Sequence, residues 1–333
     1  MAAPAPAAAP AGKGILLKAD PIAGAYRDEV KSMLAQASTK PKLVGILSTS
    51  SEPSKFYAEF TRRQCEELGV EFVLKKTGAA LEAELGEGEG VEEAIIEANE
   101  DESVNGIMVY FPIFGPQQDH YLHQVVSPLK DVEGLHFKFH YNLYHNIRFL
   151  NPKSLLETVT APSGQKTSTI DGEVPPPGMV KSIIPCTPLA IVKCLEYLGV
   201  YNRILPYGDR AYGKTITVIN RGTKSEVVGR PLAALLSNDG ARVFSVDIDS
   251  IQEVLAQSDV VVSAVPSASY KVKTEWLKDG CICLNVAADK NFEKDVRDKA
   301  SIYVPAVGKV TILMLLRNLL RLQQYQRIQE ESN

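Results

Sequence analysis

The sequence lacks several features that would assign it at once to a common class of protein. Neither the G-x-S-x-G pattern of serine hydrolases nor the H-E-x-x-H pattern of zinc peptidases is present. No apolar run approaches the roughly 18 residues that span a bilayer, so we expect no membrane partner. The 36 Lys and Arg residues are scattered and are outnumbered by 40 Asp and Glu residues, which excludes the basic clusters typical of nucleic-acid-binding proteins. The expected partner is a small molecule.

Cysteine is also scarce. The chain has 5 cysteines, an odd number in a long sequence without an apolar signal segment, which is typical of a reducing compartment without structural disulfides. Cys281 and Cys283 alternate with apolar residues, a pattern that favours packing in a buried strand. The opening MAAPAPAAAPAGKG contains no arginine and is too rich in proline for a transit or secretory peptide. We therefore expect residues 1–14 to be a disordered tail and the protein to be cytoplasmic.

Metal ligands are few and poorly spaced. His140 and His145 are five positions apart, so they cannot share one face of a helix. His120 and His123 could share a face, but no third ligand is near them in the sequence, which favours a surface pair. We predict no metal site.

Short apolar runs alternate with segments of helical periodicity throughout the chain. In the first half, strands are predicted at 42–48, 70–74 and 106–111, with helices at 22–37, 54–68 and 91–99. In the second half, strands are predicted at 215–219, 242–247, 259–265, 281–287 and 301–304. Strands separated by helices predict right-handed crossovers and parallel sheets, so both halves are expected to be α/β domains.

Two further segments complete this organisation. Residues 158–178 are rich in turn-forming residues and have no apolar period, which predicts an exposed excursion. The last helix, 310 to about 329, is apolar over a wide face and is expected to pack back on the first domain.

The segment 216–236 raises the question of a nucleotide site. It has the order strand, loop and helix that carries G-x-G-x-x-G in dinucleotide-binding folds, but those glycines are missing. The helix is expected to begin near Val228 or Gly229, with Pro231 in its first turn. The amino end of a helix binds anions through its dipole and free amides even without this signature, and Arg221 and Ser225 could add donors.

Asp247 ends the second strand of this unit. A carboxylate at that position accepts hydrogen bonds from the adenosine ribose in dinucleotide folds. The alternative is an ordinary strand-helix-strand unit with a surface aspartate, and these residues alone leave it open.

Longer motifs make a resemblance specific. One set of motifs consists of Lys130-Asp-Val-Glu-Gly134, Pro185-Cys-Thr-Pro188, Asn220-Arg221 with Ser-Glu-Val-Val-Gly-Arg-Pro231, and Asp259-Val-Val-Val-Ser-Ala-Val-Pro266. A second set consists of Gly106-Ile-Met-Val-Tyr-Phe-Pro-Ile-Phe-Gly115, Tyr141-Asn-Leu-Tyr-His-Asn146 and Gly308-Lys-Val-Thr-Ile-Leu-Met-Leu-Leu-Arg317. By the first set the chain resembles the methylenetetrahydrofolate dehydrogenase/cyclohydrolase family, from about residue 15 to 325. By the second it resembles, within that family, the monofunctional NAD-dependent enzymes of fungi.

The resemblance implies the domain layout. A folate-binding domain would comprise residues 15–184 and 310–333, and an NAD-binding Rossmann domain residues 185–309, with the C-terminal helix returning to the first domain. A cleft between the domains and a homodimer are implied as well.

Residues carried over from the family define an expected folate site. Tyr57 matches the tyrosine that stacks on the folate rings, and Glu133 stands where most relatives have an Asp that binds the pterin. Tyr110 replaces a Gln that is common in bifunctional relatives. Pro112 and Thr311 complete the expected substrate contacts.

The family also implies the cofactor contacts. Asn220 and Arg221 match its Gly-Arg pair, although three extra residues, 222–224, separate Arg221 from Ser225. The strand that lies beside the nicotinamide ends here at Asn285, Val286 and Ala287. The family resemblance also implies that Val228, Val246 and Asp247 contact the remaining parts of NAD.

The implied reaction is oxidation of 5,10-methylenetetrahydrofolate by NAD to 5,10-methenyltetrahydrofolate. Hydride leaves a carbon between two nitrogens whose lone pairs stabilise the cation, so the protein needs mainly to position the reactants and exclude water. Cys186 in Pro-Cys-Thr-Pro is a candidate catalytic residue beside Tyr57 because a cysteine at a helix start can be a thiolate, while a structural role with Thr187 as N-cap is the alternative.

Three other functions share parts of this sequence pattern: a bifunctional enzyme, a shikimate-type dehydrogenase and a non-catalytic NAD-binding scaffold. Bifunctional relatives have a lysine in a Y-x-x-x-K pattern for the cyclohydrolase step, and Thr61 occupies that position here, which predicts that the second activity is absent. A bifunctional enzyme would need another group, such as Lys55. A shikimate-type dehydrogenase is disfavoured because no Lys/Asp pair can be placed, and a non-catalytic NAD-binding scaffold because the folate residues are intact.

Overall fold

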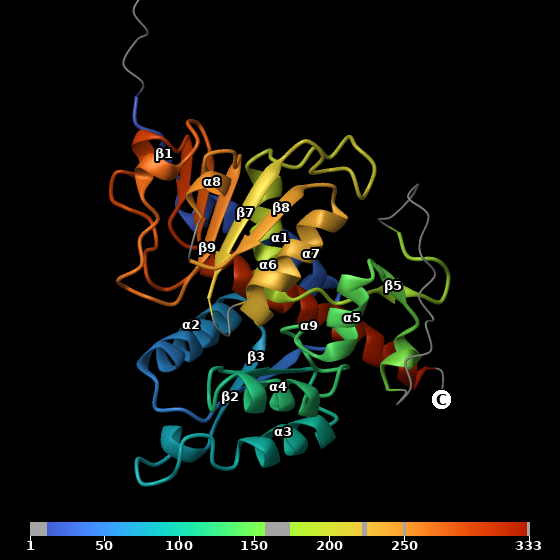
Figure 1. Cartoon of the computed structure of the whole chain (residues 1–333). Helices are drawn as coiled ribbons and strands as arrows, with labels where there is room; N and C mark the ends of the chain where they lie inside the picture. The colour runs from blue at the N-terminus through green and yellow to red at the C-terminus, as the bar shows by residue number, and fades with distance from the viewer. Residues whose placement is uncertain (1–11, 157–173, 222–224, 249–250, 332–333) are drawn as a thin grey trace, which may run out of the picture.

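The computed structural model describes residues 12–156, 174–221, 225–248 and 251–331, which form two α/β lobes (Figure 1). Most of the predicted tail, and the predicted excursion before residue 174, lie outside these residues. Within the described part of the chain, no helix is both long and apolar enough to cross a membrane.

The N-terminal lobe is built on a three-stranded parallel sheet of order β3-β2-β4. Buried apolar side chains of β2 and β4 pack against α3 and α4 in a separate core. The strands are β2 (Lys42–Leu47), β3 (Glu71–Lys76) and β4 (Gly106–Val109), and the helices are α2 (Glu52–Leu68), α3 (Val91–Glu100), α4 (Pro116–Val125) and α5 (Phe137–Tyr144). The three strands predicted from apolar runs are all present, with ends shifted by one or two residues.

The C-terminal lobe contains a six-stranded parallel sheet of order β1-β11-β10-β9-β7-β8. Its five predicted strands are all present, as are the two predicted α/β lobes. The strands are β7 (Thr215–Asn220), β8 (Arg242–Val246), β9 (Val260–Ala264), β10 (Ile282–Asn285) and β11 (Ile302–Val304), and the helices are α6 (Cys186–Tyr197), α7 (Arg230–Asn238) and α8 (Gln252–Leu255).

The N-terminus departs from the predicted domain boundary. Residues 15 and 16 were assigned to the first domain, but β1 (Ile15–Leu16) pairs in parallel with β11 at the edge of the C-terminal sheet. Gly14 precedes it because a Cβ there would lie 1.8 Å from the carbonyl oxygen of Ala300. A two-residue strand has no periodicity that a sequence pattern could reveal.

Helix α9 (Gly308–Glu330) joins the lobes, as predicted, and in Figure 1 it runs between them. It packs against α1 (Ala19–Gln36) and α6. At its far end the Gln326 amide donates to the carbonyls of Asn105 and Leu129, which lie in the N-terminal lobe. The helix is buried on most of its circumference because both lobes cover it.

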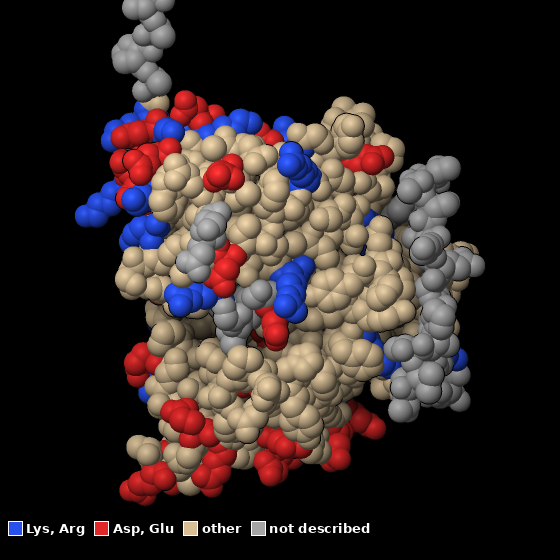
Figure 2. Space-filling model, viewed as in Figure 1, with Lys and Arg blue, Asp and Glu red and all other residues tan. Residues whose placement is uncertain are grey.

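Smaller elements connect these parts. A short antiparallel pair, β5 (Phe149–Leu150) and β6 (Val180–Lys181), flanks the residues that are not described. Lys130 lies under the carboxyl end of α3 and donates to the carbonyls of Ala98, Asn99 and Asp101, which satisfies acceptors that a helix end leaves open. Acidic side chains gather over the end of the molecule that contains α3 (Figure 2), and most glutamates between 82 and 102 are exposed, as predicted for a solvated face.

Replacing Asn318 with leucine should destabilise the fold. Asn318 is fully buried in α9, and its amide donates to the carbonyls of Val132 and Ile184, each at 3.0 Å. Because both carbonyls would lose their donor, we expect Asn318→Leu to lower the free energy of unfolding by about 2 to 4 kcal/mol in urea. Gln324→Ala, an exposed position on the same helix, is the control; equal stability of the two variants would contradict the assignment.

Candidate active site between the lobes

The carboxyl edge of the C-terminal sheet has the geometry of a nucleotide site. Strand order reverses between β7 and β9, since the chain runs from β7 outward to β8 and then back to β9 on the other side. In open parallel sheets, ligands bind in the crevice at such a reversal, outside the carboxyl ends of the strands. Asn220, Asp247 and Asn285 lie at or directly after the carboxyl ends of β7, β8 and β10.

The first loop of this edge approaches the next helix closely. After β7, a π-helical turn (Ser225–Gly229) leads into α7, with Pro231 in its first turn as predicted. A Cβ on Gly229 would lie 2.5 Å from the side-chain amide of Asn220, so only glycine fits there. The Asn220 amide also donates to Ser245 on β8 at 3.3 Å. Asn220 therefore holds β7, β8 and the helix start together, which the missing glycine motif would otherwise do.

The other predicted phosphate contacts are only partly described. Arg221 is exposed at the mouth of the loop. Residues 222–224 and the side chain of Ser225 lie outside the described residues, so the donor to the pyrophosphate stays a prediction. Val228 is buried in the main core and Val246 is half-buried against a second core, so their contact with the cofactor stays a prediction.

Asp247 is exposed directly after β8, and one of its oxygens accepts from the amide of Ile248 at 2.7 Å. A contact of its other oxygen with a ribose hydroxyl stays a prediction. Tyr270, which the sequence patterns did not single out, lies near it: burial, with the charge of Asp247 as a second cause, raises the pKa of Tyr270 to about 12. The Tyr270 hydroxyl is buried and has no hydrogen-bond partner in the described structure.

A pair of buried asparagines fixes the edge beside β9 and β10. The Asn285 amide donates to the carbonyls of Ala287 and Asp289, and its oxygen accepts from the amide of Asn291. Asn291 in turn bridges to Ser263 and Val265 at the end of β9. The side chain of Asn285 is thus fully used within the protein, and the Val286 amide donates to the carbonyl of Ser263. Contact of Asn285, Val286 and Ala287 with the nicotinamide stays a prediction.

Across the cleft, Tyr57 and Tyr110 form the centre of the predicted folate site. Their ring centroids are 6.1 Å apart at an interplanar angle of 82°. Tyr57 lies on α2 and Tyr110 follows β4. Burial raises the pKa of both hydroxyls, so both remain protonated at neutral pH, and the neighbouring Thr61 hydroxyl opposes part of the shift at Tyr110.

Glu133 reaches the same place from a tight turn. Asp131, buried at the start of that turn, accepts from the backbone amides of Glu133, Gly134 and His136. Burial raises the pKa of Asp131 to about 6, while these backbone donors oppose the shift. Gly134 has φ of 72°, and a Cβ there would lie 2.9 Å from the backbone nitrogen of Pro185. The turn therefore sets Glu133 against the start of α6.

Cys186 lies on the other side of this contact, and its amide donates to the carbonyl of Glu133 at 3.0 Å. The thiol is buried. Burial, with Glu133 as the next cause, raises the pKa of Cys186 far above that of a free thiol, although it stands at the amino end of α6. The predicted N-cap at Thr187 is wrong: the helix begins at Cys186 with Pro185 as its N-cap, two residues earlier. These features describe a neutral thiol in the wall of the cleft.

Thr61 lies one turn after Tyr57 on α2. Its hydroxyl donates to the carbonyl of Tyr57 at 2.9 Å, and the side chain is fully buried. The neighbouring cations are turned elsewhere: Arg62 and Arg63 both bind Glu59, and Lys55 binds Glu52 at 2.9 Å on the exposed face. None of these cations makes a contact in the cleft.

Pro112 and Thr311 are the remaining residues of the predicted folate site. Pro112 is exposed in the loop after β4, which is held by two backbone amides, of Ile113 and Phe114, that donate to the carboxylate of Asp119. Thr311 is buried in the first turn of α9, and its hydroxyl donates to the carbonyl of Val307 at 3.3 Å. The predicted substrate residues thus come from α2, β4, the 131–134 turn and α9, while Thr311 is committed to its own helix.

Two other motifs carry no site. Among the described residues, no three His, Cys, Asp or Glu side chains are grouped so that they could hold a metal ion. Gly208-Asp-Arg-Ala-Tyr-Gly-Lys-Thr215 fits the spacing of a phosphate-binding P-loop, but it ends where β7 begins. A P-loop must follow a strand and open a helix, so this match is coincidental.

Comparisons with known proteins agree with this geometry. A family model described as tetrahydrofolate dehydrogenase/cyclohydrolase, catalytic domain, matches residues 17–133, and its NAD(P)-binding domain matches residues 185–327. The chain is 45% identical to methylenetetrahydrofolate dehydrogenase (NAD+) of Schizosaccharomyces pombe, over 92% of each chain. It is 41% identical to the enzyme of that name from Dictyostelium discoideum, over 91% of this chain and 92% of that one. The solved structure of the NAD-dependent 5,10-methylenetetrahydrofolate dehydrogenase from Saccharomyces cerevisiae is similar, with 40% identity, a TM-score of 0.82 and coverage of 97% of this chain and 100% of that one.

The thiols should be unreactive in the native state. All 5 cysteines are free and buried. We expect a thiol reagent such as iodoacetamide to label none of them in the folded protein at neutral pH and all of them in urea, because the thiolate of Cys186 is disfavoured by burial. Rapid labelling of Cys186 alone, lost in Cys186→Ala, would instead identify it as a reactive nucleophile.

Proposed function

Because the chain belongs to the tetrahydrofolate dehydrogenase/cyclohydrolase family, we propose that it oxidises 5,10-methylenetetrahydrofolate to 5,10-methenyltetrahydrofolate with NAD and does not catalyse the cyclohydrolase step. The observation that carries the proposal is that Tyr57, Tyr110 and Glu133 of the N-terminal lobe lie together beside Cys186, which begins the first helix of the lobe that contains the nucleotide-binding sheet.

The residues at this edge fit a dinucleotide. Asn220 and Gly229 bring the backbone of the first loop close to the position of a pyrophosphate, next to the start of a helix. Asp247 is exposed, and among the described residues the buried Tyr270 hydroxyl near it has no hydrogen-bond partner. When bound, NAD supplies a ring carbon that accepts hydride. The Asn285–Asn291 clamp fixes the backbone at which that ring is expected.

The protein's part in the reaction is positioning. Tyr57 offers a ring face to the folate, and Glu133 offers a carboxylate to the amino groups of the pterin. The product cation is stabilised by the two folate nitrogens on either side of the carbon, so no proton has to move at the step in which hydride leaves. Neutral groups such as the Cys186 thiol and the Tyr110 hydroxyl line the cleft and exclude water from it.

The second candidate function, a bifunctional dehydrogenase/cyclohydrolase, is disfavoured by the surroundings of Thr61. Attack of water on the methenyl carbon needs proton transfers, which a lysine one turn after the stacking tyrosine would supply. Thr61 cannot replace the lysine. Its side chain is short, and its hydroxyl does not titrate near neutrality and donates a hydrogen bond to the carbonyl of Tyr57. Lys55 is held by Glu52 outside the cleft.

We also propose a homodimer and a place in purine biosynthesis, on the family resemblance, and a cytoplasmic location, on the cysteine content and the composition of residues 1–14. Sedimentation of the purified protein at micromolar concentration tests the first of these directly.

Cofactor choice should depend on Asp247. The extra 2′-phosphate of NADP would place negative charge against this carboxylate, whereas the ribose hydroxyls of NAD can donate to it. We expect kcat/KM with NAD to exceed that with NADP by at least about tenfold. Asp247→Ser should lower the ratio of kcat/KM with NAD to kcat/KM with NADP. Asp279 is exposed near the opposite edge of the sheet, so Asp279→Ser should leave this ratio unchanged. Similar kcat/KM values for the two cofactors in the wild type would refute the proposed role.

Hydrolysis of added methenyltetrahydrofolate should proceed at the buffer rate. Because Thr61 is fully buried beside Tyr110, a lysine there needs space, so we expect Thr61→Lys alone to be destabilised. Thr61→Lys with Tyr110→Gln should fold better and gain measurable hydrolysis. Thr61→Met with Tyr110→Gln, of similar volume but without an ammonium group, is the control. Wild-type hydrolysis that exceeds the buffer rate and is lost on heating would show that the second activity is present.

A further inference from the structure

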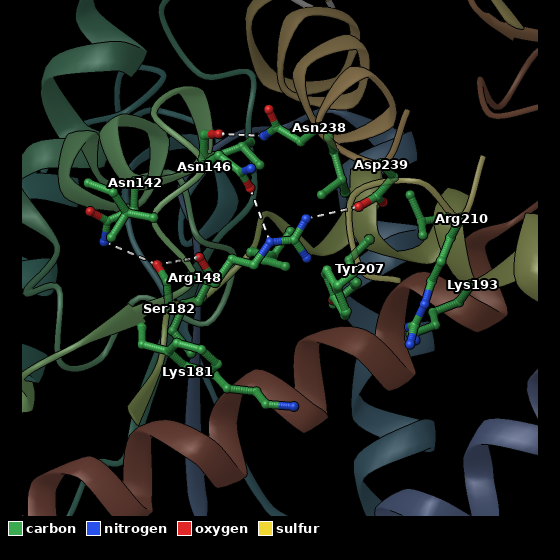
Figure 3. Close-up of a pocket in the computed structure, with 18 of the residues that line it drawn as sticks. Asn142, Asn146, Arg148, Lys181, Ser182, Lys193, Tyr207, Arg210, Asn238 and Asp239 are labelled. Carbon is green, nitrogen blue, oxygen red and sulfur yellow. Dashed lines mark hydrogen bonds and ion pairs between the residues drawn. The ribbon is translucent and has the colours of Figure 1, made fainter. Parts of the chain in front are cut away.

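A separate cavity of about 100 Å³ lies between α5, the β5–β6 pair, α6, the 201–210 loop, α7 and α9 (Figure 3). Neither the folate residues Tyr57 and Glu133 nor the cofactor residues Asn220 and Asp247 line it. It draws residues from both lobes and from the helix that joins them. The cavity therefore belongs to neither of the sites described above.

The lining of this cavity is strongly cationic. Six of its residues carry a positive charge and two a negative charge, although the whole chain has a net charge of −4. The two acidic residues are Glu196 and Asp239, and the cationic residues are Arg148, Lys181, Lys193, Arg210, Arg317 and Arg321. An excess of one sign in a concave site concentrates ions of the other sign.

Both acidic groups are already occupied by two of these cations. Arg148 binds Asp239 at 3.1 Å, and Tyr201 donates to the other oxygen of the same carboxylate. Lys193 binds Glu196 at 2.7 Å. No carboxylate of the lining is left over for the remaining cations.

A tyrosine orders part of the wall. The ring of Tyr207 lies between two guanidinium groups, with the carbon of Arg148 3.6 Å and that of Arg210 4.6 Å from its centroid. Figure 3 shows Arg148, Tyr207 and Asp239 on one side of the cavity and Lys181 and Lys193 on others. These side chains are held in place before any ligand arrives.

Arg321 is the exception to this pairing. Within the part of the chain that the structure describes, its guanidinium group makes no hydrogen bond or ion pair. It is half-buried one helical turn from Arg317, whose own Nε lies 2.9 Å from Glu29. Burial, and then the charge of Arg317, lower the pKa of Arg321. Two like charges one turn apart destabilise a helix, and Glu29, which pairs with Arg317 and acts on Arg321 only through space, offsets this repulsion in part. An anion bound at Arg321 would offset more of it.

The space available suits a compact anion. A cavity needs only about 10 to 15 Å³ to hold one water, so this one accommodates several waters or an oxyanion group. Neutral polar side chains are present as well: Asn142 donates to the Ser182 hydroxyl at 3.1 Å, and this hydroxyl donates to the carbonyl of Ile183 at 3.4 Å. Arginine forks match the geometry of phosphate and carboxylate oxygens.

We propose that this interlobe cavity binds a small molecule with clustered oxyanion groups, phosphates or carboxylates, and that Arg321 is its principal anchor. The ligand contacts α9 and both lobes, so its binding favours the interlobe arrangement seen in the structure. The site is independent of the reaction in the cleft.

The test uses the full-length protein saturated with NAD, so that the cofactor's own phosphate contacts are occupied. Inorganic pyrophosphate and tri-γ-glutamate are titrated separately by calorimetry in chloride buffer, which distinguishes a phosphate source from a carboxylate source. We expect one of the two probes to bind, and Arg321→Gln to weaken its binding at least about tenfold, because a hydrogen-bonded charge pair is lost. Arg327→Gln, an exposed arginine on the same helix that pairs with Glu331, should bind like the wild type.

A second readout separates binding from folding. Since Arg321→Gln removes an unpaired charge, we expect its melting temperature without the probe to equal or exceed that of the wild type, and the probe to raise it less. Arg321→Met provides the same comparison if the glutamine variant does not fold. Absence of binding of both probes at millimolar concentration, or binding that is unchanged in both Arg321 variants, would overturn the proposal. Either result leaves the dehydrogenase assignment untouched, because that is measured in the cleft.

Discussion

The contact between the 131–134 turn and the start of α6 is the constraint on which the cleft depends. Asp131 closes the turn through backbone amides, Gly134 allows the chain to pass against Pro185, and the Glu133 carbonyl accepts the amide of Cys186. Asn318 then binds the backbone on both sides of this contact. The turn that carries Glu133 and the first helix of the C-terminal lobe are thereby fixed to each other by one set of hydrogen bonds.

Much of the architecture could be predicted from the sequence because its signals are local. Continuous apolar runs marked the buried parallel strands, and the strand, loop and helix order at 216–236 marked the nucleotide edge without its glycines. The position of Asp247 followed from the strand before it. The roles of Tyr57 and Glu133 needed the family resemblance, since nothing in their immediate sequence distinguishes a ligand-facing tyrosine or glutamate from an ordinary one.

What could not be predicted depends on contacts between distant segments. β1 is only two residues long and is defined by pairing with β11, almost 300 positions away. The Asn285–Asn291 clamp and the proximity of Tyr270 to Asp247 arise from loops whose sequences are unremarkable. Residues from six parts of the chain line the cationic cavity, so its excess of positive charge cannot be recognised from the distribution of Lys and Arg along the sequence. The burial that suppresses the thiolate of Cys186 likewise outweighs its position at a helix start.

The path of the chain has a consequence for dissecting the protein. It begins as an edge strand of the nucleotide sheet, forms the other lobe, returns at residue 185 and leaves again through α9. Neither lobe is a continuous piece of sequence. A fragment starting at residue 185 would expose the backbone of β11, since β1 would be absent, and unpaired strand edges promote association between molecules. Removing the first 16 residues would have the same effect on the intact enzyme, so a segment remote from the cleft governs how well the protein stays dispersed in solution.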